Sequence, residues 1–385
     1  MAGVAVTPAV PLATAYVTLV GSKALLAARV ARREPACAPS TGAGVAVAQA
    51  ILSGDPRLAD VLTDNVRMLP EAHFLWLVDA DDPAGEATCR AVAAAAPGAR
   101  IGVLVLPPAP AGTNPKLWKL EAARRATDAP AFLVLDDDTR MPAATLGALT
   151  AALDRHDLAT SLPVYRAGRD WPSRLLAQFV ANNAATTYLP LVPWLAPVTI
   201  NGMAYVLRRS MLDAMGGFAP LFPHLTDDLA VAMRVGASGG TIFQSARTHE
   251  VETSVRDGGH YRQLMHRWFL FALLLLRAQP AGYRVLITLL HGVPPVLLWS
   301  LLLAVLWRPT PSAFVACGIA LVARALAIVA VHHAIGTPGR HAPLLSLLSE
   351  LLQPLHLLHA AVWRRITWRT RHYRVVDAGE FEAVE

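Results

Sequence analysis

The sequence predicts an α/β domain joined to membrane helices, and three observations lead to this fold class. Between about Gly42 and His260, short apolar runs alternate with stretches of helical pattern, which is typical of a mostly parallel sheet flanked by helices. Two of the apolar runs end in groups of aspartates, as strands that lead into a ligand site do. The chain of 385 residues is 54% hydrophobic and only 16% charged, which indicates additional membrane segments.

The charged residues and the cysteines narrow the class of protein. The formal net charge of +6 comes mainly from arginine, because Lys23, Lys116 and Lys119 are the only lysines. Basic residues are not interleaved with aromatic ones, so we expect no binding to nucleic acid. The three cysteines lie far apart and form neither a metal-binding spacing nor a disulfide framework, which fits a reducing compartment.

Residues 1–33 predict a retained membrane anchor. The apolar stretch from Val4 to Ala28 is long enough to span a bilayer, and arginines follow it at once. A cleaved signal peptide would carry its positive charge before the apolar run. The positive-inside rule then places the following domain in the cytoplasm. A helix that lies on the membrane surface is the alternative.

Residues 42–262 are expected to form the α/β domain. Short apolar runs bounded by turn residues predict strands over residues 44–48, 74–78, 101–106 and 131–135. Helical periodicity predicts helices over residues 58–68, 84–95 and 117–126. Because a helix separates each strand from the next, the strands should run parallel to one another.

Two of these strands end in carboxylates. Asp79 and Asp82 follow the second strand, and Asp136, Asp137 and Asp138 follow the fourth directly. Three adjacent like charges repel one another, so stability alone does not favour them. A divalent cation shared with a substrate phosphate would relieve the repulsion, since Mg²⁺ usually takes one or two carboxylates plus phosphate oxygens. A solvated acidic turn is the alternative interpretation.

Five stretches resemble, in order, the motifs of a known enzyme family: VDADDPA (78–84), NPKLWKL (114–120), LVLDDDT (133–139), NGMAYVLRRSMLDAMGGF (201–218) and TDDLAVAMRV (226–235). They are similar to those of family 2-type glycosyltransferases, which have the GT-A fold. Within that group the chain most resembles ceramide glucosyltransferases and their bacterial, hopanoid-type relatives. The resemblance runs from about Gly44 to Trp268 and implies a mixed, mostly parallel sheet flanked by helices.

The resemblance also implies a role for each acidic residue of these motifs. Asp228 corresponds to the general base, and Asp138 with Asp136 to the ligands of a divalent metal, Mg²⁺ or Mn²⁺. The residues expected to contact the nucleotide-sugar donor, a UDP-sugar by expectation, are Asp79, Asp82, Lys116, Asp136 and Asp227. Single displacement by an acceptor hydroxyl would invert the anomeric centre.

Two of these assignments have a structural alternative. Thr226 followed by Asp227 and Asp228 is also good chemistry for the N-terminus of a helix, with Thr226 as the N-cap. Lys116 could contact a phosphate, but it could equally be a surface lysine.

The chain departs from the family in its Q/RxxRW motif, which here reads RQLMHRW over residues 262–268. Leu264 stands where Gln or Arg is usual. Either Gln263 reaches the same place, or Arg262 and His266 replace it. The residues expected on the acceptor or product side are Gln263, Arg267 and Trp268.

The chain after residue 262 is expected to meet the membrane. Residues 263–280 predict an interfacial helix, because their apolar run, 268–276, is too short to span and has an arginine at each end. Residues 283–363 predict a C-terminal membrane region. Residues 364–385 form a basic and then acidic tail.

Two spans are expected in that membrane region. The first covers 285–307 and should be kinked by Pro294 and Pro295. The second covers 313–335 and contains Arg324, which needs a partner; we expect it to pair with Glu350.

A third apolar stretch, 343–363, precedes a cluster of arginines. If it spanned, alternation would place these arginines outside, against the positive-inside rule. A re-entrant or interfacial segment is therefore expected.

Together these observations predict a multi-pass protein of the plasma or inner membrane with a cytoplasmic hexosyltransferase domain. Its acceptor would be the hydroxyl of a lipid such as ceramide or a hopanoid. A processive polysaccharide synthase is the first alternative, disfavoured by the small number of clear spans. A non-catalytic membrane protein is the second, disfavoured by the retained aspartates.

Overall fold

The computed structural model describes residues 8–252, 254–368, 371–377 and 380–384. Its contacts divide the chain into two compact units, each assembled from three segments. The helical unit comprises Met1–Arg33, Arg169–Pro193 and Asp257–Trp363, and the α/β unit comprises Glu34–Gly168, Trp194–Arg256 and Arg364–Glu385. The range expected for the catalytic domain, 42–262, is therefore interrupted, because residues 169–193 belong to the helical unit.

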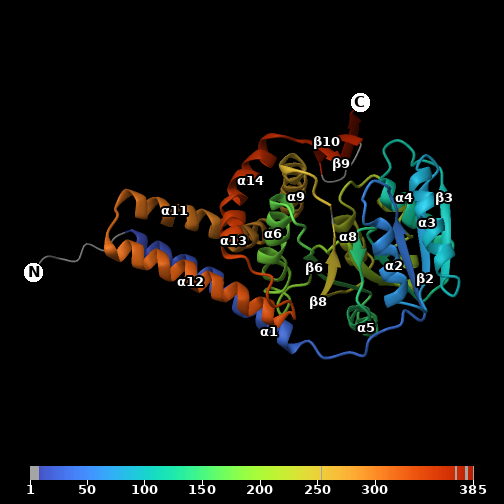
Figure 1. Ribbon diagram of the computed structural model, residues 1–385, viewed down its shortest axis with the longest axis horizontal. Coiled ribbons are helices and arrows are strands. Elements are labelled where there is room, and N and C mark those ends of the chain that lie inside the picture. Colours follow the sequence, from blue (N-terminus) through green and yellow to red (C-terminus); the bar gives the residue numbers. More distant parts are fainter. Residues whose placement is uncertain (1–7, 253, 369–370, 378–379, 385) are drawn as a thin grey trace, which may run out of the picture. The chain divides into compact units, whose positions relative to one another are not determined.

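The α/β unit is built on an eight-stranded mixed sheet with the strand order β3-β2-β1-β4-β7-β6-β8-β5 (Figure 1). The strands are β1 Val45–Ala50, β2 His73–Asp79, β3 Arg100–Leu106, β4 Ala131–Leu135, β5 Thr139–Arg140, β6 Leu158–Tyr165, β7 Ala204–Arg208 and β8 Ile242–Val251. Strands β1 to β4 are parallel, and β6 is parallel to β8, whereas β7 pairs antiparallel with β4 and β6, and β5 with β8. The predicted fold class is confirmed, and the four predicted strands are β1 to β4.

Helices cover both faces of this sheet. Helices α2 (Leu58–Met68), α3 (Pro83–Ala95) and α5 (Ala143–Ala152) contribute to the apolar core on one face, and α4 (Pro115–Arg125), α7 (Arg209–Ala214) and α8 (Asp227–Ala237) to the core on the other. In β4, Leu133 and Leu135 enter the first core and Phe132 and Val134 the second. Because successive side chains of a strand point to opposite faces, burial on both faces explains the unbroken apolar run before Asp136.

The helical unit contains the following helices: α1 Ala9–Arg33, α6 Trp171–Tyr188, α9 Gly258–Ala278, α10 Ala281–Ile287, α11 Val293–Trp307, α12 Pro311–Ala334, α13 Pro343–Leu351 and α14 Gln353–Val362. Helices α1, α11 and α12 pack together around an apolar core that includes Tyr16, Leu298, Leu301 and Ala320 (Figure 1). The last apolar stretch is divided into α13 and α14, which meet at Leu352.

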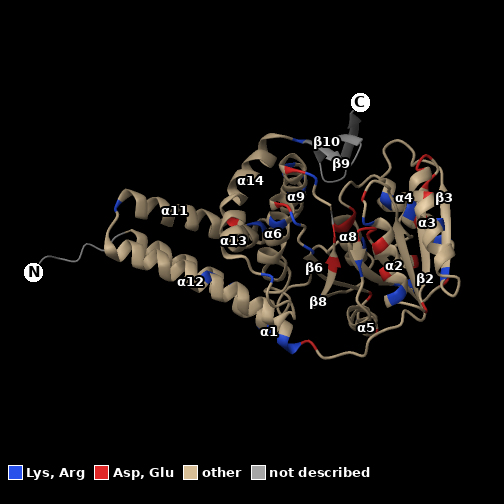
Figure 2. Cartoon of the chain, viewed as in Figure 1, with Lys and Arg blue, Asp and Glu red and all other residues tan. Residues whose placement is uncertain are grey.

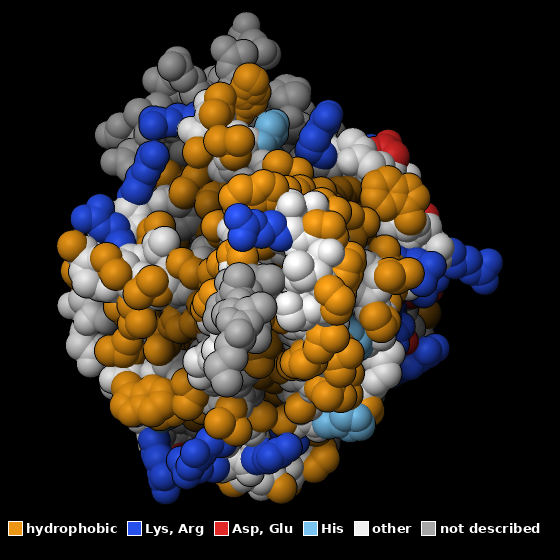
Figure 3. Space-filling view, turned by 90° about the vertical axis from the view of Figure 1, so that its left-hand side faces the viewer, with side chains coloured by type: hydrophobic (Ala, Val, Ile, Leu, Met, Phe, Trp, Pro, Cys, Tyr) orange, Lys and Arg blue, Asp and Glu red, His pale blue; other side chains and the backbone are white. Residues whose placement is uncertain are grey.

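Four helical stretches among the described residues are long and apolar enough to cross a membrane: Ala9–Arg33, Ala281–Trp307, Pro311–Ala334 and Pro343–Val362. Figure 2 shows that α11 and α12 carry almost no charged residues. Figure 3, in which the left-hand side of Figure 1 faces the viewer, shows many hydrophobic side chains. The anchor and both expected spans are thus apolar helices, while the re-entrant course of the third stretch stays a prediction.

A π-helical turn, Thr288–Gly292, lies between α10 and α11, just before Pro294 and Pro295, and the expected kink at these prolines stays a prediction. Pro294 has no N–H with which to bond the carbonyl of Leu290, four residues earlier. That carbonyl instead accepts a hydrogen bond from Lys23 Nζ at 2.7 Å. A lysine of α1 thereby satisfies the backbone group that the proline leaves unbonded.

Arg324 pairs with Glu350, as predicted: Arg324 Nε donates to Glu350 Oε2 at 2.5 Å. The Tyr16 hydroxyl donates to the other oxygen of Glu350 at 2.9 Å, and Arg324 Nη1 donates to Ser346 Oγ at 2.9 Å. Asn182 of α6 donates to the Ser346 carbonyl at 3.0 Å. One positive and one negative charge therefore neutralise each other, with further hydrogen bonds, as burial in an apolar environment requires.

Two further segments differ in extent from the expected ones. The apolar run 268–276 belongs to a longer helix, α9, which begins at Gly258 after the N-cap Asp257. Its interfacial placement stays a prediction. In the tail, the described backbone forms a three-stranded antiparallel sheet of β9 (Arg365–Trp368), β10 (Arg371–Asp377) and β11 (Glu380–Val384).

Candidate active site

The carboxyl ends of β1, β2 and β4 meet at one edge of the eight-stranded sheet. The strand order reverses here, because β1 is followed outward by β2 on one side and by β4 on the other. Ligands of open α/β sheets bind at such a switch point. Gln49 of β1 connects the three strands: its Oε1 accepts from Trp76 Nε1 at 3.0 Å, and its Nε2 donates to the Asp136 carbonyl at 3.4 Å.

The three adjacent aspartates after β4 have separate partners. Buried Asp137 accepts a hydrogen bond from the Leu52 amide at 2.9 Å. Asp138 accepts from Thr139 Oγ1 at 3.1 Å. Asp136 Oδ1 lies 2.8 Å from Lys116 Nζ. The repulsion expected for three neighbouring carboxylates is thus relieved by three different contacts.

The Asn-Pro-Lys segment at the start of α4 has a structural explanation. Asn114 is the N-cap, and its Oδ1 accepts from the Lys116 amide at 3.0 Å, while Pro115 occupies the first turn, where no N–H is needed. The side-chain amide of Asn114 also donates to the carbonyls of His224 and Leu225, at 3.0 and 3.2 Å. Asn114 therefore ties the start of α4 to the loop before α8 and sets Lys116 between them.

Lys116 is shared by two carboxylates from remote parts of the chain. Its Nζ lies 2.8 Å from Asp136 Oδ1 and 2.8 Å from Asp227 Oδ2, and it donates to the Gly202 carbonyl at 2.8 Å. The side chain is only 13% exposed. Of the two interpretations left open by the sequence, the surface lysine is therefore wrong, and contact with a phosphate stays a prediction.

Asp227 and Asp228 begin α8, but Thr226 does not cap the helix through its side chain. Asp228 Oδ1 accepts a hydrogen bond from the Leu229 amide at 2.7 Å. The loop that holds Gly202 approaches so closely that a Cβ on Gly202 would lie 3.1 Å from the Asp228 Cβ. The two aspartates do occupy the first turn of α8, but the expected capping by the Thr226 side chain is absent.

The electrostatics distinguish Asp228 from its neighbours. Burial and the negative charge of Asp227 raise the pKa of Asp228 to about 7. Burial also raises the pKa of Asp136, although Lys116 acts against it. The charges of Asp136 and Asp227 hold the pKa of Lys116 well above its usual value despite its burial. Lys116 therefore stays charged near neutral pH, where Asp228 exchanges its proton, as a general base must.

The carboxylates after β2 are occupied by the protein. Buried Asp79 lies 2.8 Å from Lys119 Nζ, which also donates to the Ile51 carbonyl at 2.8 Å. Asp82 accepts from Ser53 Oγ and N at 2.5 and 2.8 Å and caps α3. Burial acts to raise the pKa of Asp82, but the hydrogen bonds from Ser53 outweigh it, and the pKa is lowered. Both acids thus hold the loop after β1, and their contact with a nucleotide stays a prediction.

Sequence reasoning did not identify Gln49 as part of this site, and it gave no role to Asn114 or Lys119, although both lie in the motif NPKLWKL. The rarity of lysine is the signal that would have found Lys119. In this arginine-rich chain each of the three lysines is largely enclosed: Lys23 is 8% and Lys119 is 4% exposed, and Lys116 bridges two acids. No local pattern reveals Gln49, because its partners come from β2 and from the residue after β4.

The residues expected on the acceptor side lie on α9, in the helical unit. Gln263 is exposed, and Arg267, four residues later, lies on the same face of the helix. Trp268 packs against Phe179 of α6, with ring centroids 6.1 Å apart. The ring of His266 packs against the ring of His359 of α14, with centroids 4.6 Å apart. Their contact with acceptor or product stays a prediction.

The donor set fits a divalent cation that is shared with a substrate. Among the described residues, no three His, Cys, Asp or Glu side chains converge to hold a metal ion by themselves. Asp136 and Asp138 nevertheless present two carboxylates from one turn. Mg²⁺-type ions that also bind phosphate oxygens need only one or two carboxylates from the protein.

The fold and the match to a family model together define the chain as a glycosyltransferase with a GT-A-like fold. The chain belongs to glycosyl transferase family 21, whose family model matches residues 5–381. A comparison with curated protein sequences gave no match. The predicted enzyme class is confirmed, whereas the ceramide-like or hopanoid-like specificity stays a prediction.

Two solved structures are similar to this chain. The mannosyltransferase PcManGT from Pyrobaculum calidifontis, in complex with GDP-Man and Mn²⁺, has a TM-score of 0.50 and 17% sequence identity, covering 91% of this chain and 98% of that one. TarS from S. aureus, in complex with UDP-GlcNAc, has a TM-score of 0.39 and 12% identity over 89% of this chain and 99% of that one. The first likeness supports the fold, and the second is too distant to add to it.

Proposed function

We propose that the chain transfers a sugar from a nucleoside diphosphate sugar to the hydroxyl of a membrane lipid, with inversion at the anomeric carbon. The observation that carries this proposal is the position of Asp228 next to Asp227 at the start of α8, where burial and the charge of Asp227 raise the pKa of Asp228 to about 7. Asp228 in its ionised form accepts the proton of the acceptor hydroxyl as that oxygen attacks the sugar. Attack opposite to the leaving diphosphate inverts the configuration.

The donor would bind at the switch point of the sheet. Asp136 and Asp138 would hold a divalent cation, Mg²⁺ or Mn²⁺, which when bound supplies positive charge for the leaving diphosphate. Lys116 adds a permanent positive charge next to Asp136 and Asp227 and orients both. Asp79 and Asp82 shape the loop after β1, on which the nucleotide would rest. The similar mannosyltransferase contains GDP-Man with Mn²⁺, which supports this arrangement.

The apolar helices of the helical unit support a lipid acceptor. Four stretches are apolar and long enough to cross a membrane, so the enzyme would act at the surface of a bilayer, with the catalytic domain on its cytoplasmic face. A lipid presents its hydroxyl at that surface, and Gln263, Arg267 and Trp268 of α9 would contact it or the product. Ceramide and hopanoids carry hydroxyl groups of this kind.

A panel of labelled donors tests the proposal. Membranes that contain the full chain would be incubated with UDP-glucose, UDP-galactose, UDP-N-acetylglucosamine or GDP-mannose, followed by lipid extraction and separation of the products. One donor should give a labelled glycolipid, whose anomeric configuration by NMR is opposite to that of the donor. A labelled polymer would instead identify a processive synthase.

Two variants assign the product to this site. Asp138→Ala should abolish transfer. Asp213→Asn is the control and should not, because Asp213 pairs with arginines on α4 and α7. Transfer close to the wild-type rate in Asp138→Ala would reject the assignment.

A further inference from the structure

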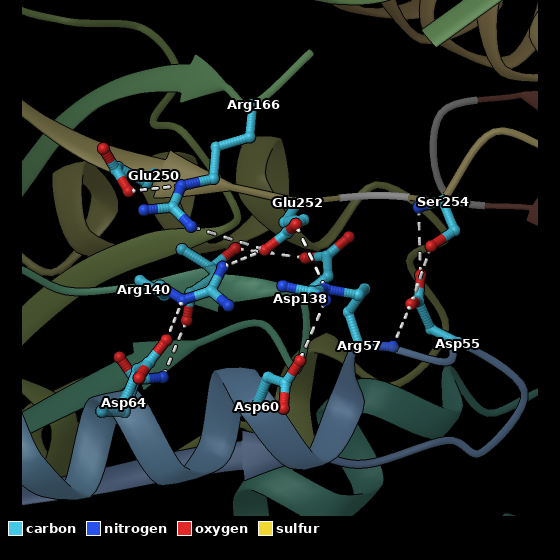
Figure 4. A network of polar contacts seen from close by, with 12 residues as sticks. Asp55, Arg57, Asp60, Asp64, Asp138, Arg140, Arg166, Glu250, Glu252 and Ser254 are labelled. Carbon is cyan, nitrogen blue, oxygen red and sulfur yellow. Dashed lines mark hydrogen bonds and ion pairs between the residues drawn. The ribbon is translucent and has the colours of Figure 1, made fainter. Parts of the chain in front are cut away.

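Glu252, the residue after β8, shares its carboxylate among three arginines (Figure 4). Its Oε1 lies 3.3 Å from Arg57 Nε, whereas Oε2 contacts Arg140 Nη1 and lies 3.8 Å from Arg166 Nη1. The arginines come from the loop before α2, from β5 and from the segment after β6. One side chain therefore joins three separate segments of the α/β unit.

The backbone of Glu252 reaches Asp138. Its amide donates to the Asp138 carbonyl at 2.9 Å. Arg140, two residues after Asp138, is the arginine that Glu252 contacts most closely, and its side chain is only 4% exposed. Glu252 is thus bound to the segment 138–140 twice, by its backbone at Asp138 and by its side chain at Arg140.

The same turn is held from the opposite side by α2. Buried Asn65 donates to the Thr139 carbonyl at 2.8 Å and accepts from the Met141 amide at 3.0 Å. Asp64 accepts from Arg140 Nε at 2.7 Å. Because the backbone after Asp138 is bonded on both sides, the direction of the Asp138 side chain depends on these contacts.

Charge gives Glu252 a second effect on Asp138. Figure 4 shows Asp138 between Arg140 and Arg57. The positive charges of these arginines disfavour any cation held by Asp138. Glu252 carries the negative charge that contacts both of them, and Arg166 as well. Removing that charge would leave the arginines less compensated next to the carboxylate.

We propose that Glu252 positions Asp138 and offsets the arginine charge around it, and thereby sets the affinity of this site for its divalent cation. The inference rests on the proposed function, because it takes Asp138 as a ligand of that cation. Glu252 is a positioning residue: it acts on the cation through Asp138 and through the arginines.

The test is cation affinity, measured separately from transfer. Purified full-length protein with UDP would be titrated with Mn²⁺, and free Mn²⁺ followed by electron paramagnetic resonance. Glu252→Gln keeps the size of the side chain and removes its charge. We expect the Mn²⁺ dissociation constant to rise about 10–100-fold, as for other residues that support metal ligands, while kcat at saturating Mn²⁺ stays near wild type.

Glu250→Gln is the matched control. Glu250 lies on β8, two residues before Glu252, and pairs with one of the same arginines, Arg166, at 2.8 Å. Its variant should bind Mn²⁺ like wild type. Wild-type affinity in Glu252→Gln, or equal weakening in Glu250→Gln, would overturn the inference. A kcat that falls at every Mn²⁺ concentration, with a lower thermal midpoint, would show a purely structural role and overturn it too.

Asp138→Ala separates this inference from the proposed function. If Asp138→Ala loses Mn²⁺ and Glu252→Gln does not, only the role of Glu252 fails. If wild type binds no Mn²⁺, or Asp138→Ala binds it like wild type, the metal assignment fails and the role of Glu252 fails with it.

Discussion

The two units of this protein differ in how the charges of one buried cluster in each are balanced. In the α/β unit, Lys116 lies between Asp136 and Asp227, and Asp228 follows directly, so acids outnumber the base that holds them. In the helical unit, Arg324 meets Glu350 one to one. Figure 2 shows this contrast, with charged residues near α8 and almost none along α11 and α12.

The difference separates charges that serve chemistry from charges that serve architecture. An excess of acid gains no stability, and together with burial the charge of Asp227 raises the pKa of Asp228. A balanced pair with Tyr16 and Ser346 as additional partners links helices without leaving a group ready to react. We therefore expect variants of the first cluster to change activity and variants of the second to change stability.

The largest expected effect is on the rate of transfer. Asp228→Asn removes the proton acceptor and keeps the size of the side chain, so transfer should fall about 10²–10⁴-fold. The thermal midpoint should stay close to that of the wild type. The measurement is labelled glycolipid formed per minute in membranes with equal amounts of protein. Retention of more than half of the activity would remove Asp228 from the mechanism.

The next effect concerns the helical unit. Arg324→Leu leaves Glu350 charged without its partner, and loss of one member of a buried pair costs about 3–5 kcal/mol. Unfolding in detergent should follow at a lower temperature, with kcat unchanged below it. The double variant Arg324→Leu, Glu350→Leu should recover most of the loss. If the double variant is less stable than the single one, charge balance is not what the pair provides.

The dependence of kcat/KM on pH tests the electrostatic account of Asp228. Asp228 must be ionised to accept a proton, so kcat/KM should rise with pH through its pKa of about 7. Asp227→Asn removes the like charge that raises this pKa. The rising limb should therefore move to lower pH, by about one unit.

The control for the profile is Asp213→Asn, which lies on α7 and should leave the limb in place. A limb that moves to higher pH in Asp227→Asn, or does not move, contradicts the electrostatic account of Asp228.

The smallest expected effect compares two helix N-caps. Asp170, the N-cap of α6 in the helical unit, accepts a hydrogen bond from the Ser173 amide at 2.9 Å, whereas Thr226 makes no side-chain cap before α8. Asp170→Ala should lower stability by about 1 kcal/mol, and Thr226→Ala by less than about half of that, because no capping bond is lost. Thermal midpoints of the two variants provide the measurement. Equal losses would show that Thr226 does cap α8.

The sequence by itself determined the fold class, the four parallel strands and the positions of the acids at their ends. These features depend on local patterns: apolar runs of strand length, helical periodicity between them and turn residues at their limits. It also determined the apolar stretches long enough to cross a membrane. The pair Arg324–Glu350 could be predicted as well, because so few charges occur in that part of the chain.

In the α/β unit, only the tertiary structure decided which charges meet. Lys116 contacts Asp227, and Glu252 contacts Arg57, across long separations in the sequence that no periodic pattern records. Tertiary packing also assigned residues 169–193 to the helical unit. The physical reason is that ion pairs depend on how remote segments pack, whereas strands and helices depend mainly on neighbouring residues.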